Sequence, residues 1–124
     1  MFATLIQVAA GGALGASARY LTWVGATRLF GLGFPWGTLI VNVVGSFLMG
    51  VLIVMLAERD AMRFAPFLTV GLLGGFTTFS AFSLDAVTLV ERGQVGAAAG
   101  YVGASVAVSI TALMLGLWIA RGAI

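Results

Sequence analysis

Residues 71–83 read Gly-Leu-Leu-Gly-Gly-Phe-Thr-Thr-Phe-Ser-Ala-Phe-Ser, and this run lies inside one of four long uncharged stretches of the chain. Glycine in a helix interior costs about 1 kcal/mol relative to alanine, and threonine is also a weak helix former. The run is therefore a poor helix interior. We expect the helix that contains it, over residues 65–90, to be broken near its centre, between residues 71 and 78.

The four uncharged stretches cover residues 1–18, 29–57, 64–84 and 93–120. The chain has 124 residues, of which 61% are hydrophobic and 8% are charged, and soluble domains rarely have such a composition. A helix needs about 20 apolar residues to cross a bilayer. The sequence therefore predicts an all-α integral membrane protein with four transmembrane helices, near residues 2–27, 37–56, 65–90 and 95–120, in a single domain spanning 1–124.

The composition also argues against several classes of function. The chain has no Cys and no His, which excludes thiol chemistry, zinc sites and Ser-His or Cys-His catalysis, so we do not expect an enzyme. The pI near 10.0 reflects a net charge of +2 from few, scattered charges. Without a basic patch, no nucleic-acid partner is expected. The first residues lack the positive region of a secretory signal, so we expect the first span to be retained.

The arginines leave the orientation of the chain open. In a four-span topology one side carries Arg59, Arg63 and Arg121, and the other carries Arg28 and Arg92, with Arg19 added if it reaches outward. Flanking arginines normally mark the cytoplasmic side, but here the two sides nearly balance. Either the rule is weak in a short protein, or the chain inserts in both orientations, which would permit an antiparallel dimer.

Two neutral groups are candidates for binding an anion. Asn42 is the only Asn of the chain and falls within the second span, one turn before Ser46. Its amide either joins helices or donates a hydrogen bond to an anion. Phe79 and Phe82 share a helix face if the helix resumes after the break, and Ser80 and Ser83 alternate with them. Aromatic rings in membrane helices often only pack, but their positive edges can face an anion.

The break itself and the last span supply further candidates. A broken helix frees backbone carbonyls, so those of Gly74 and Thr77 could hold a sodium ion; the alternative is a simple kink with the Thr77 and Thr78 hydroxyls bonded back to the chain. Tyr101, Ser105 and Ser109 recur every four residues and line one helix face. This line either passes an ion or bonds neighbouring helices. Asp85 and Arg19 are the ionisable residues nearest the hydrocarbon, and their roles stay open.

Three motifs in order resemble the Fluc/CrcB family of fluoride channels over nearly the whole chain. They are Gly11-Gly12-x-x-Gly15-Ala16-x-x-Arg19-Tyr20, Gly37-Thr38-Leu39-x-Val41-Asn42-x-x-Gly45-Ser46 and Gly74-Gly75-x-Thr77-Thr78-Phe79-Ser80-x-Phe82-Ser83. Two positions depart from the family pattern. Ala81 stands where many relatives carry a threonine, and Asp85 stands where relatives often carry a glutamate.

The resemblance implies an antiparallel, dual-topology homodimer with two fluoride pathways in the lipid bilayer. It also implies one structural Na+ on the dimer axis, held by the backbone carbonyls of Gly74 and Thr77. By position, the fluoride pathway would contain Asn42, Phe79, Ser80, Phe82, Tyr101, Ser105 and Ser109. The implied localisation is the cell inner membrane, crossed several times.

The predicted function is passive, fluoride-specific conduction that exports fluoride from the cytoplasm and lowers its toxicity. Neutral donors can replace the water of a small anion without holding it too tightly to leave. One competing hypothesis is a small proton-coupled multidrug-type exporter, which relies on a buried carboxylate in its first helix. Here the first span has none, and Asp85 is the only acidic residue within a span. A non-transporting scaffold is the other alternative.

Overall fold

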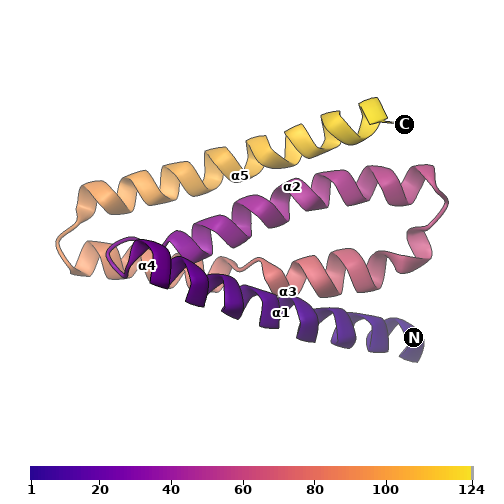
Figure 1. Ribbon diagram of the computed structural model, residues 1–124, viewed down its shortest axis with the longest axis horizontal. Coiled ribbons are helices and arrows are strands. Elements are labelled where there is room, and N and C mark those ends of the chain that lie inside the picture. Colours follow the sequence, from indigo (N-terminus) through magenta and orange to yellow (C-terminus); the bar gives the residue numbers. More distant parts are fainter. Residues whose placement is uncertain (124) are drawn as a thin grey trace.

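The computed structural model describes residues 1–123, which are helical apart from short connections and contain no strand. Figure 1 shows the order of the elements along the chain. They are α1 (Phe2–Phe30), α2 (Trp36–Glu58), a 3-10 turn η1 (Met62–Phe64), a π-helix η2 (Pro66–Leu73), α3 (Gly74–Phe76), α4 (Phe79–Glu91) and α5 (Val95–Ala123). The all-α prediction is therefore confirmed, and the predicted spans agree with these elements to within a few residues.

Three helical segments are long and apolar enough to cross a membrane: Trp36–Glu58, Met62–Glu91 and Val95–Ala123. These segments are typical of a multi-pass membrane protein. Helix α1 has 29 residues and is long enough, but it is not among the three. Gln7, Arg19 and Arg28 make it less apolar than α2 and α5. A fourth crossing by α1 therefore stays a prediction.

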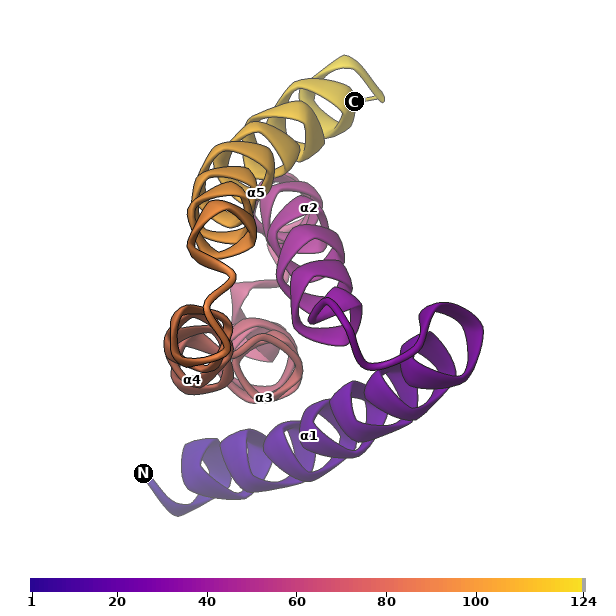
Figure 2. The ribbon, with the colours of Figure 1, turned by 90° about the vertical axis from the view of Figure 1, so that its left-hand side faces the viewer.

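Successive long helical segments run in opposite directions along the long axis of the molecule, which is horizontal in Figure 1. Both chain ends and the turn after α2 lie at one end of the molecule, and the connections after α1 and α4 lie at the other. Helices α2 and α5 lie side by side, while α1 crosses the broken segment formed by η2, α3 and α4 (Figure 2). Arg28 and Arg92 thus belong to one end, and Arg59, Arg63 and Arg121 to the other.

The predicted break in the third helical segment is confirmed. Thr77 and Thr78 have extended backbones, with φ/ψ of −87°/160° and −155°/124°, and the helix resumes at Phe79. The eight residues before Gly74 form a π-helix, a feature that was not predicted from the sequence. A membrane helix with such irregular backbone needs replacement hydrogen bonds, because no water is available to supply them.

Glycines let the helices approach closely at some positions but not at others. A Cβ at Gly11 or Gly15 would overlap the backbone of η2, and a Cβ at Gly50 or Gly116 would overlap the facing backbone of α5 or α2. The four-residue spacing of Gly11 and Gly15 in α1 therefore marks a packing face. The same spacing at Gly96 and Gly100 does not, since a Cβ there would meet nothing within 4 Å inside the chain. Those two glycines instead face outward.

Candidate functional site

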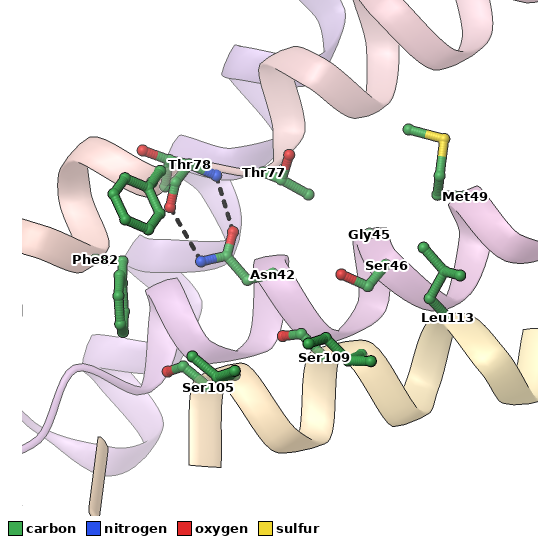
Figure 3. Close-up of a pocket in the computed structure, with 13 residues that line it drawn as sticks. Asn42, Gly45, Ser46, Met49, Thr77, Thr78, Phe82, Ser105, Ser109 and Leu113 are labelled. Carbon is green, nitrogen blue, oxygen red and sulfur yellow. Dashed lines mark hydrogen bonds between the residues drawn. The ribbon is translucent and has the colours of Figure 1, made fainter. Parts of the chain in front are cut away.

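The helix break is held by the side chain of Asn42, which comes from the first half of α2. Its Nδ2 donates to the carbonyl oxygen of Thr78 at 3.0 Å, and its Oδ1 accepts from the backbone N–H of Thr78 at 2.8 Å. Figure 3 shows both bonds between the amide and the break. In a continuous helix the Thr78 N–H would donate to the carbonyl of Gly74. The Asn42 Oδ1 atom therefore replaces the acceptor that the break takes from the Thr78 N–H, and Nδ2 adds a second bond to the carbonyl of the same residue.

The two threonine hydroxyls at the break also bond to nearby groups. Thr77 Oγ1 donates to the carbonyl of Leu73 at 2.9 Å. Thr78 Oγ1 accepts from the N–H of Ala81 at 3.1 Å and so caps the start of α4, and it lies 3.2 Å from Ser80 Oγ. A threonine with extended backbone followed by such a bond is a standard N-cap. The alternative in which these hydroxyls bond to the local backbone is thus present in the structure.

A cavity of about 450 Å³ opens beside the break, between α2, α4 and α5. No charged residue lines it. Five of the predicted pathway residues do: Asn42, Phe79, Phe82, Ser105 and Ser109. Ser80 and Tyr101 do not. Figure 3 shows Asn42 and Thr78 on one side of this cavity and the two serines of α5 on the other. The remaining lining residues are Gly45, Ser46, Met49, Thr77, Thr78, Val106, Ile110 and Leu113.

The serines of α5 carry hydroxyl groups with no partner. Ser105 Oγ and Ser109 Oγ are both buried, and neither makes a hydrogen bond within residues 1–123. Buried polar groups in native proteins nearly always have a partner, and an unpaired one costs about 1–3 kcal/mol. Each hydroxyl can donate one hydrogen bond into the cavity. The arrangement therefore suits a ligand that accepts hydrogen bonds.

The two phenylalanines form a tilted pair. Their ring centroids are 5.5 Å apart with an interplanar angle of 47°. The Phe79 side chain is 78% exposed, whereas Phe82 is half-buried and packs against the ring of Tyr101 at 5.2 Å. Both belong to the first turn of α4, so the position of the break sets the direction of both rings. The predicted shared face is confirmed.

Tyr101 lies at the centre of a small core rather than at the cavity wall. Its side chain is fully buried, and its hydroxyl donates to Asp85 Oδ2 at 3.1 Å. The Phe34 ring meets the Tyr101 ring edge-on at 5.5 Å. The three hydroxyl residues predicted to form one line along α5 therefore have two different roles. Ser105 and Ser109 line the cavity, whereas the Tyr101 hydroxyl bonds to Asp85. The Tyr101–Asp85 bond was not predicted, because the two residues lie on different helices and their separation of 16 positions carries no helical-periodicity signal.

The carbonyls of Gly74 and Thr77 lie where the regular helical hydrogen bonds stop. The usual donor to the Gly74 carbonyl, the Thr78 N–H, is taken by Asn42 at 2.8 Å. Thr77 is extended, and Gly74 is exposed. Carbonyl oxygens are the ligands that hard cations prefer. These two groups therefore fit a small cation in their chemistry.

Arg19 also reaches the break, from α1. Its Nε donates to the carbonyl of Gly75 at 3.0 Å, and the side chain is partly buried. The sequence marked Arg19 as a charge close to the hydrocarbon, but it did not predict this contact. The only available signal was that an arginine within a membrane segment needs a partner.

Known proteins of one family match nearly the whole chain. Residues 6–117 match the family described as CrcB-like protein, Camphor Resistance (CrcB). A Cereibacter sphaeroides protein named fluoride-specific ion channel FluC is 69% identical over 122 residues, covering 98% of each chain. A protein of the same name from Ruegeria sp. (strain TM1040) is 55% identical, and the match covers 98% of each chain. Another from Paracoccus denitrificans is 54% identical, and the match covers 96% of this chain and 95% of the relative. This chain therefore belongs to the CrcB family.

Proposed function

We propose that this chain forms a fluoride-specific ion channel that lets fluoride leave the cytoplasm passively and so lowers its toxicity. One observation carries the proposal: an uncharged cavity at the helix break contains two buried serine hydroxyls without partners. The name shared by its curated relatives agrees with it. Export of an anion down its own gradient needs no catalytic group and no energy source.

The neutrality of the cavity suits conduction of a small anion. Fluoride without partners in a low-dielectric site would face a desolvation cost on the order of tens of kcal/mol. Hydroxyl, amide and ring-edge donors can replace its water. An arginine in the cavity would also attract chloride and would hold fluoride tightly, whereas permeation requires a site that the ion can leave.

The proposed pathway contains Asn42, Phe79, Ser80, Phe82, Tyr101, Ser105 and Ser109. Ser105 and Ser109 donate hydrogen bonds to the ion, and the edges of the two phenylalanine rings face it. One N–H of Asn42 is engaged by Thr78, which leaves the other for the ion. Ser80 acts from the exposed start of α4. Tyr101 acts through packing on Phe82 and through Asp85.

The proposed assembly is an antiparallel homodimer of four-span chains in the inner membrane, with each orientation inserted equally well. The balance of arginines between the two ends, three against two, supports the absence of a preferred orientation. Phe79 and Gly74 are exposed in the single chain. A second copy that covers them would enclose the pathway and bring two breaks together on the dimer axis.

The proposed cofactor is one structural Na+ on that axis, held by the carbonyls of Gly74 and Thr77 from both subunits. The ion would join the two breaks and neutralise oxygens that lack helical donors. If it is present, replacing Na+ by choline at equal ionic strength lowers the thermal unfolding midpoint of the purified protein. A ligand at about 100 times its Kd adds roughly 2.7 kcal/mol of stability. Identical unfolding in both salts contradicts the sodium site.

Fluoride efflux from liposomes tests the function directly. Purified protein is expected to release fluoride when a potassium ionophore balances the charge, at a rate that a proton gradient does not change. A fluoride-selective electrode measures the release, and chloride efflux measured in parallel reports selectivity. Strict dependence on proton exchange favours the multidrug-type exporter. Equal release of chloride, or no release of either anion, contradicts the proposal.

The aromatic pair is expected to be required for conduction. Phe79→Ile and Phe82→Ile each remove a ring edge while keeping an apolar side chain of similar bulk. We expect flux to fall about tenfold or more, a barrier increase of roughly 1.4 kcal/mol, with the dimer intact by size-exclusion chromatography. Phe2→Ile is the matched control, because Phe2 is exposed at the start of α1. Normal flux in both ring variants contradicts the assignment.

Replacing either unpaired serine is expected to change stability and conduction in different directions. Ser105→Ala and Ser109→Ala each remove a buried hydroxyl that has no partner, so the variants are expected to be as stable as the parent or more stable, by up to about 1–3 kcal/mol. Their fluoride flux should nevertheless fall roughly tenfold, because each loses one hydrogen bond to the ion.

Ser17→Ala serves as the control for the serine variants, since Ser17 is exposed and bonds to the Ala13 carbonyl. Unfolding curves and liposome flux are measured on the same preparations. If both cavity serines can be replaced without loss of flux, they do not belong to the pathway.

A further inference from the structure

We propose that Arg19 is a positioning residue for the helix break, acting through its hydrogen bond to Gly75 rather than through its charge. The bond joins α1 to the centre of the broken segment: Arg19 Nε donates to the Gly75 carbonyl at 3.0 Å. In a regular helix that carbonyl would accept from the N–H of Phe79. The break lies between the two residues, so the arginine supplies a donor in place of the lost one.

The surroundings of Gly75 favour a fixed contact over a chance one. A Cβ at Gly75 would lie 2.8 Å from the carbonyl oxygen of Gly12 and 3.2 Å from the backbone nitrogen of Ala16. The two backbones are therefore in direct contact. Ala16 and Arg19 are three residues apart and share a face of α1. The Arg19 side chain therefore starts close to the place where the α1 backbone contacts Gly75, and it bonds to the carbonyl of that same glycine.

The charge of Arg19 has no matching acid in this region. The chain has four acidic residues, and the hydrogen bond that Arg19 makes within residues 1–123 is to a carbonyl. A long arginine at a membrane interface often reaches outward to water. Here the side chain is instead partly buried and bonded inward. A charged group within a membrane segment is costly to keep and usually serves a purpose.

Asn42 and Arg19 together hold the break from opposite sides. Asn42 of α2 bonds Thr78, the second extended residue of the break, and Arg19 of α1 bonds Gly75 in α3, just before the break. Thr77 lies between the two bonded residues, Gly75 and Thr78, and Phe79 follows Thr78 directly. Because Gly75 and Thr78 are both held by side chains of other helices, the place where α4 begins is fixed. The direction of the Phe79 and Phe82 rings follows from that starting point.

Three substitutions separate the hydrogen bond from the charge. Arg19→Gln keeps a neutral N–H donor at the same number of bonds from the backbone as Nε. Arg19→Met keeps the length but has no donor, and Arg19→Lys keeps the charge with a donor one bond further out. Arg28→Gln and Arg28→Met are matched controls, since Arg28 is exposed in the last turn of the same helix.

The first measurement is the geometry of the break, and it does not depend on conduction. The chain has no cysteine, so Val70→Cys and Leu84→Cys place spin labels only on the two sides of the break. Both positions are exposed, by 60% and 68%. Labelled chains are diluted into excess unlabelled chains, and the distance distribution is measured by double electron–electron resonance. The second measurement is fluoride flux, and this arm rests on the proposed function.

We expect Arg19→Gln to keep the parental distance and most of the flux. Arg19→Met should broaden or shift the distance and lower the flux by roughly tenfold or more, consistent with loss of one hydrogen bond to the Gly75 carbonyl. The Arg28 controls should match the parent. If Arg19→Met does not assemble, the Arg19→Gln and Arg19→Lys pair decides: retention by Gln supports the proposal, and retention by Lys alone overturns it.

Two further outcomes overturn the proposal. One is parental distance and flux in Arg19→Met, which makes the bond irrelevant. The other is parental distance with lost flux, which places the charge itself in conduction. If instead the parent conducts no fluoride while Arg19→Met alone changes the distance, positioning by Arg19 stands and the proposed function fails.

Discussion

Two hydrogen bonds between the Asn42 amide and the backbone of Thr78 are the contact on which the site depends. A helix cannot open in hydrocarbon unless each freed N–H and carbonyl finds another partner. Asn42 provides both a donor and an acceptor from one side chain, so it can pair with a single residue as a neighbouring strand would. The opening can then persist in a segment that has little access to water. The cavity, the ring pair and the free carbonyls all follow from it.

The polar groups around the opening differ in how far their bonding capacity is used. Threonine hydroxyls at the break are engaged, by Leu73 and by Ala81. The serine hydroxyls across the cavity are buried and unengaged. This division separates groups that maintain the shape of the site from groups available to an ion. Since none of the lining residues is charged, a bound anion would meet only dipoles, whose attraction is strong at contact and weak beyond it.

Much of the architecture could be predicted from local pattern, because local pattern is what produced it. The uncharged stretches gave the helices, and the glycines before Thr77 indicated the break. Three features were out of reach for a physical reason. The pairing of Tyr101 with Asp85 joins side chains of two different helices, α5 and α4. The spacing of Gly96 and Gly100 is the same as that of packed glycines, yet only the arrangement of neighbouring helices decides which glycines are covered. The third is the π-helical segment, because its amino-acid composition does not distinguish it from an α-helix.

That π-helical segment, Pro66–Leu73, affects everything that follows it. Each of its turns encloses one residue more than an α-turn, and a residue in a helix corresponds to about 100° of rotation. Compared with an α-helix of the same length, the π-helix therefore rotates the residues that follow it about the helix axis. This rotation sets the direction in which the chain enters the break. A single-residue deletion within it would leave hydrophobicity and length almost unchanged, yet it would turn the downstream side chains toward a different neighbour. The amino-acid composition would therefore give no sign of the damage that this deletion causes.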